Sequence, residues 1–124
     1  MSETVPLVFE EPSVDLVDVA RHAQLPYGLS DNGTVVSVKG SGQVCHIVEI
    51  LDYAVEGILD DPKLAEVCVK PVAIFSIDYR SASLVVKVVR DLSAWRPCLV
   101  DTNYGDLIAG RDLTEAHLNP QRLL

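Results

Sequence analysis

Short runs of β-branched and apolar residues recur along this chain and predict strands. Each run is bounded by Gly, Pro, Asn or Asp residues, which favour turns, and Asn32-Gly33 predicts a tight turn before the second run. Pro6 is expected to confine the first strand to a sheet edge or to the start of the strand. The predicted strands span residues 5–10, 34–39, 72–77 and 98–100, and residues 107–109 form either a further strand or a helical turn.

Between these runs, apolar residues recur at helical spacing. The clearest pattern predicts an amphipathic helix over 43–59, which is expected to face a sheet containing Ile74 and Phe75. Its apolar stripe is formed by Val44, Ile47, Val48, Leu51, Val55 and Ile58. Residues 84–95 predict a helix, although the four valines in it leave a strand over 84–89 open. Shorter helices are predicted over residues 14–24, over 63–68 and from Asp112 onward.

Strands and helices therefore alternate in the order β-α-β-α-β-α-β-α. This order predicts an α/β fold, a layered sandwich of about four strands with alternating helices. The continuous apolar run 72–77 suits the central strand, because such a strand is buried on both faces. No repeat or linker divides the chain, so residues 1–124 are expected to form a single domain.

Acidic residues outnumber basic ones, with 18 Asp and Glu against 10 Lys and Arg and a net charge of -8. This balance disfavours nucleic acid and anionic membranes, because both require clustered Lys and Arg. No stretch reaches the roughly 18 apolar residues of a membrane span, and the acidic N-terminus does not resemble a signal peptide. We therefore expect a cytoplasmic protein whose partner is a protein with a basic surface.

The three cysteines, Cys45, Cys68 and Cys98, are odd in number and widely spaced. This pattern is typical of reduced, mostly buried thiols in a cytosolic protein. Structural zinc uses ligand pairs two to four residues apart, and a catalytic cysteine needs a base across space from it. Neither pattern occurs here, so we expect no metal, no cofactor and no catalytic residue, and an enzyme is the less favoured interpretation.

Acidic residues off the apolar stripe of the 43–59 helix are the predicted partner-binding residues. A protein with this charge attracts basic surfaces over long range. The alternative is a plain solvated helix face, because charges usually lie opposite an apolar stripe. The predicted docking residues are Glu49, Asp52 and Glu56 on the helix and Asp60 and Asp61 in the turn after it.

The loop Gly40-Ser41-Gly42 is placed between a predicted strand and a predicted helix. Glycines there allow a backbone to approach an anion at a helix N-terminus, although a purely structural turn is the favoured interpretation. A second function therefore stays open, a small enzyme or nucleotide-binding domain that uses this loop and acids near strand ends. Those acids are Asp78, Asp101 and Asp106.

Residues 34–110 resemble a STAS domain, the fold of bacterial anti-sigma-factor antagonists. Residues 33–40 are similar to the family's strand and following glycine, and the predicted helix 43–59 and strand 72–77 come in family order. Ser81 and Ser83 stand where the family carries its phosphorylated serine, although the motif's Gly is missing and Asp78 is displaced. The resemblance implies a regulator that binds another protein. An inhibitor or immunity-type protein covering a cationic toxin or enzyme fits the same charge.

Overall fold

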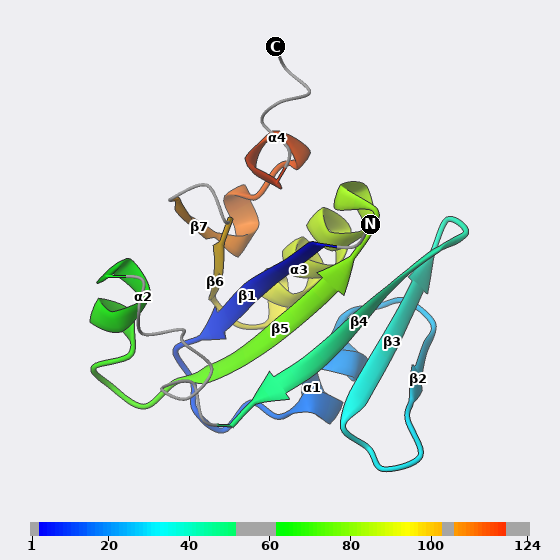
Figure 1. Ribbon diagram of the computed structural model, residues 1–124, viewed down its shortest axis with the longest axis horizontal. Helices are drawn as coiled ribbons and strands as arrows, with labels where there is room; N and C mark the ends of the chain where they lie inside the picture. The colour runs from blue at the N-terminus through cyan, green and yellow to red at the C-terminus, as the bar shows by residue number, and fades with distance from the viewer. Residues whose placement is uncertain (1–2, 52–61, 103–105, 119–124) are drawn as a thin grey trace.

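The computed structural model describes residues 3–51, 62–102 and 106–118 (Figure 1). Within these residues, strands form one antiparallel sheet in the order β2-β3-β4-β5-β1-β6-β7. The strands are β1 (Glu3–Phe9), β2 (Tyr27–Leu29), β3 (Val35–Gly40), β4 (Gln43–Ile50), β5 (Ala73–Tyr79), β6 (Cys98–Asp101) and β7 (Leu107–Ala109). The helices are α1 (Leu16–His22), α2 (Pro62–Val67), α3 (Ala82–Trp95), the 3-10 turn η2 (Gly110–Asp112) and α4 (Glu115–Leu118).

This architecture overturns the predicted sandwich of about four strands with alternating helices. Over the described ranges the sheet has seven strands, and each pairing between them is antiparallel. The physical reason lies in the connections, because β2, β3 and β4 follow one another through turns and not through helices. Antiparallel neighbours can be joined by two residues, whereas parallel neighbours need a crossover.

The largest correction concerns β4, which replaces the start of the predicted helix 43–59. Gly40 pairs with Gln43 across a two-residue turn, in which Ser41 and Gly42 have φ of 51° and 76°. Two consecutive residues with positive φ are the signature of a hairpin turn whose twist matches that of the strands. Leu51, predicted to be buried, is 83% exposed just after β4. Val55 and Ile58 lie outside the described residues.

The helix predicted over 84–95 is confirmed as α3, and the alternative strand over 84–89 is wrong. Ser81 is the N-cap, and its Oγ accepts a hydrogen bond from the Leu84 N–H at 3.4 Å. Three of its four valines are buried, and this burial compensates for the modest helix propensity of valine. The buried residues of α3 are Leu84, Val85, Val88, Val89 and Leu92.

The helix predicted over 14–24 is confirmed as α1, which is shorter. Asp15 caps it, because its Oδ1 accepts from the Asp18 N–H at 2.8 Å while Asp18 Oδ2 accepts from the Asp15 N–H at 3.2 Å.

The prediction from Pro6 is wrong in both of its alternatives, because β1 lies between β5 and β6 and not at an edge, and Pro6 is the fourth residue of the strand and not its start. Proline lacks the N–H that pairing on both sides would require. Pro6 is tolerated because only β5 pairs with it, since the pairing between β1 and β6 begins at Leu7.

The two faces of the sheet are covered unequally. α1 and α3 lie behind the sheet in Figure 1 and bury its inner face, where Phe9 and Phe75 meet edge to face at 5.7 Å. On the opposite face, Leu64 of α2 packs with Val8 and Ile74 at one end of the sheet. None of the described helices has the length and apolar content needed to cross a bilayer.

Candidate functional site

The candidate site is the open face, which we define as the side chains of β3, β4 and β5 that point away from α1 and α3. Alternation along β4 buries Cys45 and Ile47 on the inner face and directs Val44, His46 and Val48 outward. Val44 is 39% exposed and Val48 is 38% exposed. No described helix lies in front of these strands in Figure 1. The sheet therefore presents apolar side chains to solvent over its β3–β5 portion.

A row of three polar residues crosses the open face. The register pairs Ser37 of β3 with His46 of β4, and His46 with Asp78 of β5. Ser37 Oγ lies 2.9 Å from His46 Nδ1, within hydrogen-bond distance. Directly opposed residues in antiparallel strands place their side chains on the same face. The three side chains thus form one polar strip between Val44 and Val48.

Asp78 has the unusual environment in this row. Its Oδ1 is buried and has no hydrogen-bond partner among the described residues. Buried polar atoms in folded proteins are almost always hydrogen-bonded, and an unpaired one requires an explanation. Asp78 lines a pocket of about 400 Å³ together with Gly42, Gln43, Val44, His46, Tyr79 and Arg80. An incoming donor or cation would satisfy this oxygen.

A second hollow of about 570 Å³ adjoins the first on the side of β2 and β3. Val44 and His46 line both hollows, so they form the ridge between them. Lys39 is the charged residue that lines this second hollow. The two hollows therefore differ in charge, with a carboxylate and Arg80 in the first and a lysine in the second.

Serine, histidine and aspartate in one row invite comparison with a nucleophile–base–acid triad. In such a triad the acid binds and orients the histidine. In the described structure His46 makes a hydrogen bond to Ser37, and none links it to Asp78. The row therefore lacks the contact that makes a histidine an oriented base, and its arrangement suits binding better than nucleophilic catalysis.

Of the five acids predicted to bind a partner, the structure describes only Glu49, and it places this residue on a strand and not on a helix. Glu49 lies on β4 and faces the inner side of the sheet, where burial raises its carboxyl pKa and the nearby Asp15 carboxylate raises it further. Asp52, Glu56, Asp60 and Asp61 lie outside the described residues. Glu49 is thus held beside α1 and cannot share one helix face with those acids.

The predicted anion loop has a different setting from the expected one. Gly40, Ser41 and Gly42 form the β3–β4 hairpin turn and not a strand-to-helix junction. The fold nevertheless brings Gly40 and Ser41 together with Ser81, Ser83 and Lys87 around a pocket of about 280 Å³. Ser81 and Ser83 contact each other at 3.0 Å, and Lys87 pairs with Asp91 at 3.1 Å. These side chains therefore already have partners within the chain.

The other acids near strand ends are separate from this site. Neither Asp101 nor Asp106 lines the pocket at Asp78. Asp101 ends β6, which lies on the other side of β1 from β5, and the Asp106 carbonyl accepts from the Thr102 N–H at 3.0 Å. The fold therefore does not bring the three possible strand-end ligands, Asp78, Asp101 and Asp106, into one cluster.

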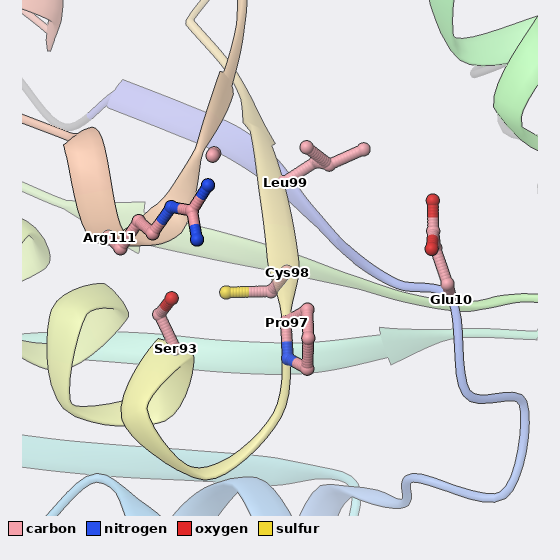
Figure 2. Close-up of a pocket in the computed structure, with 7 residues that line it drawn as sticks. Glu10, Ser93, Pro97, Cys98, Leu99 and Arg111 are labelled. Atoms are coloured by element: carbon pink, nitrogen blue, oxygen red, sulfur yellow. The ribbon is translucent and has the colours of Figure 1, made fainter.

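A further pocket, of about 260 Å³, borders Cys98 (Figure 2). Figure 2 shows Ser93 and Arg111 on the side toward which the thiol points, with Glu10 across β6 from them. Burial raises the pKa of the Cys98 thiol to about 12, so it is protonated at neutral pH. A Cβ added at Gly110 would lie 2.6 Å from its Sγ, which shows how tightly the sulfur is packed. This thiol is a core residue and not a nucleophile.

Sequence reasoning identified Asp78 as a possible ligand but missed Ser37 and His46. A signal for Ser37 exists in the alternation of apolar and polar residues over 36–39, Val-Ser-Val-Lys. No such signal marks His46, because residues 44–48, Val-Cys-His-Ile-Val, do not alternate and instead fit a helical stripe. The register, which is set across three strands, then brings Ser37, His46 and Asp78 together.

No protein-family model, curated protein or solved structure matches this chain. Among the described residues, no group of three or more His, Cys, Asp or Glu side chains is arranged to hold a metal ion. All three cysteines are free, with Cys45 and Cys98 buried. The function must therefore be argued from the open face itself.

Proposed function

We propose that this protein is a binding module that docks a protein partner with a basic surface on its open face, where Asp78 accepts a cationic side chain. One observation carries the proposal: among the described residues, the buried Oδ1 atom of Asp78 has no hydrogen-bond partner, and it borders a pocket in a sheet face that no described helix covers. An arginine or lysine from a partner supplies the missing donor. A hydrogen bond between ionised groups is among the strongest that a protein makes.

The surroundings of Asp78 support a protein partner. The exposed Val44 and Val48 flank the polar row on β4 and offer apolar area that a partner would cover. The residues that contribute most to binding in protein interfaces are typically surrounded by weaker contacts that exclude water. Arg80 also lines the pocket and gives the partner a second charge to match. The net charge of -8 favours encounter with a basic surface.

This proposal covers both partner roles suggested by the sequence, a STAS-like regulator and an inhibitor of a cationic toxin or enzyme. The placement of Gly40-Ser41-Gly42 in a hairpin turn removes the argument for a nucleotide at a helix start. We therefore propose a binding role and not a nucleotide-binding enzyme, and as the sequence suggests, we place that role in the cytoplasm.

Nuclear magnetic resonance titration tests the proposed anchor without knowledge of the partner. The probes are two capped tripeptides, Gly-Arg-Gly and the same peptide with uncharged citrulline in place of arginine. We expect the arginine peptide to shift the amide signals of Val44, His46 and Asp78 and the citrulline peptide to shift them far less. Asp78→Asn should raise the dissociation constant for the arginine peptide at least about tenfold, because the carboxylate that binds the arginine is lost.

The matched control is Glu66→Gln, which removes one exposed carboxylate from α2, a helix whose residues do not line the pocket at Asp78. This variant should respond to the arginine peptide as the wild type does. Equal shifts for Asp78→Asn and wild type would show that Asp78 does not bind the peptide. Loss of the response in Glu66→Gln as well would show that binding depends on net charge only, and either result refutes the anchor.

A further inference from the structure

The strand β2 ends the sheet, and its outer edge is unpaired within the described residues. On its inner edge, the Lys39 N–H donates to the Pro26 carbonyl and the Ser30 N–H donates to the Val35 carbonyl, both at 2.9 Å. Backbone groups along an antiparallel strand point alternately to one neighbour and to the other. The N–H and C=O groups of Tyr27 and Leu29 therefore point outward.

This outer edge is complementary to itself. If a second β2 lies antiparallel with Gly28 opposite Gly28, Tyr27 of each copy is opposite Leu29 of the other. The two residues then exchange N–H and C=O bonds in both halves of the pair, and the outward groups of both strands are all satisfied. Tyr27 is 44% exposed and Leu29 is 47% exposed, so an aromatic and an aliphatic side chain are free to pair across the strands.

Two features remove the usual obstacles to such pairing. Natural sheet edges are commonly protected by lysine or by an inward charge, but residues 26–30 (Pro-Tyr-Gly-Leu-Ser) contain no charged side chain. Two copies that each carry a charge of -8 therefore oppose no like charges within this register. At the axis, a Cβ added to Gly28 would meet nothing within 4 Å inside its own chain.

We infer that β2 pairs with β2 of a second copy of this chain about a twofold axis at Gly28, which joins two sheets into one. The contact involves three residues from each copy, so the dimer belongs to the small, transient class of interfaces. Twofold symmetry closes the assembly at two copies, because each edge is used by the other. The inference does not depend on the proposed function, and it places the two open faces side by side.

A cysteine at the axis tests the geometry directly. The Gly28–Gly28 pair lies between two hydrogen-bonded pairs, so its Cα atoms should be about 4.5 Å apart, within the disulfide range of about 4.4–6.8 Å. In a Cys68→Ser background, Gly28→Cys should form a disulfide-linked dimer with oxidised glutathione. Asp31→Cys, an exposed position in the next turn, is the control and should not. Equal dimer formation by both variants, or none by Gly28→Cys, refutes the pairing.

A charge exchange tests the register. Tyr27→Lys with Leu29→Lys places a lysine opposite a lysine twice in the dimer, whereas Tyr27→Glu with Leu29→Lys places opposite charges there. By sedimentation equilibrium up to about 1 mM protein, the first variant should raise the dimer dissociation constant at least about tenfold, and the second should stay within about threefold of wild type. Thermal melting confirms that both variants fold.

Equal effects of the two charge variants contradict this register. A wild-type chain that remains monomeric at about 1 mM overturns the inference, since the edge is then free for a strand of a different protein.

Discussion

Burial governs the ionisable groups on the inner side of this sheet. It raises the pKa of the Cys45 thiol to about 11 and that of the Cys98 thiol to about 12. It also raises the carboxyl pKa of Glu49, and the neighbouring Asp15 carboxylate acts in the same direction. Desolvation disfavours the charged form of each of these groups. Glu49 is therefore an acid whose ionisation works against folding.

Glu49→Gln should make the stability of the protein less sensitive to pH. A folded-state pKa above the ordinary value of 4.5 means that the folded state binds this proton more tightly than the unfolded state. Protonated Glu49 therefore stabilises the folded state, and this contribution is complete below about pH 4.5. It is lost as the pH rises through the folded-state pKa. In urea unfolding, the free energy of unfolding of the variant minus that of wild type should be larger at pH 7 than at pH 4.

The control for this experiment is Glu66→Gln, which removes an exposed carboxylate on α2 instead of the one beside Asp15. The difference in free energy of unfolding between this control and wild type should change less between pH 4 and pH 7 than it does for Glu49→Gln. If Glu49→Gln follows wild type at both pH values, the Glu49–Asp15 repulsion has no effect on stability.

At the scale of elements, β4 determines which side chains reach solvent. As a strand, it separates Ile47, which is fully buried, from Val48, which is 38% exposed. A helix would have placed both residues on one buried stripe, together with Leu51. The same strand holds His46 between Ser37 and Asp78, so the site depends on this element being extended.

Alanine substitutions at neighbouring positions distinguish the strand from the helix. Ile47→Ala should lower the free energy of unfolding by about 2–5 kcal/mol, because it leaves a cavity in the core. Val48→Ala and Leu51→Ala should each cost less than about 1 kcal/mol, since both side chains are exposed. Urea denaturation measures all three. Similar large losses at positions 47, 48 and 51 would contradict the strand.

At the scale of the molecule, a net charge of -8 is combined with an open face whose polar row includes one carboxylate, that of Asp78. Long-range attraction and local docking are therefore separate contributions to binding. Exposed charges act over about 8–10 Å at physiological salt, so they affect the encounter rate. A desolvated contact at Asp78 acts after docking and affects dissociation.

This separation predicts how a basic partner responds to salt and mutation, measured by surface plasmon resonance. The association rate should fall as salt rises, and Glu66→Gln should lower that rate modestly while leaving dissociation unchanged. Asp78→Asn should speed dissociation at least about tenfold. An Asp78→Asn variant that changes association alone would place the interface elsewhere.

The sequence by itself determined much of the local structure. Residues 5–10, 34–39, 72–77 and 98–100 are strands as predicted, and 14–24 and 84–95 contain helices. In these segments, propensity, apolar spacing and boundary residues agree, so one local structure is favoured. Asn32-Gly33 also lies in a turn as expected, with Gly33 at φ 71°. The net charge and the free cysteines needed no structure.

Only the tertiary structure decided the state of residues 43–50 and, with it, the fold class and the site. Val44, Ile47 and Val48 fit a helical stripe, and they are also β-branched residues suited to a strand. The choice depends on two neighbours, because β3 and β5 supply hydrogen bonds to both edges of β4. Local spacing cannot contain that information, since the partners lie elsewhere in the chain. The meeting of Ser37, His46 and Asp78 depends on the same register, and so it too is a property of the assembled sheet.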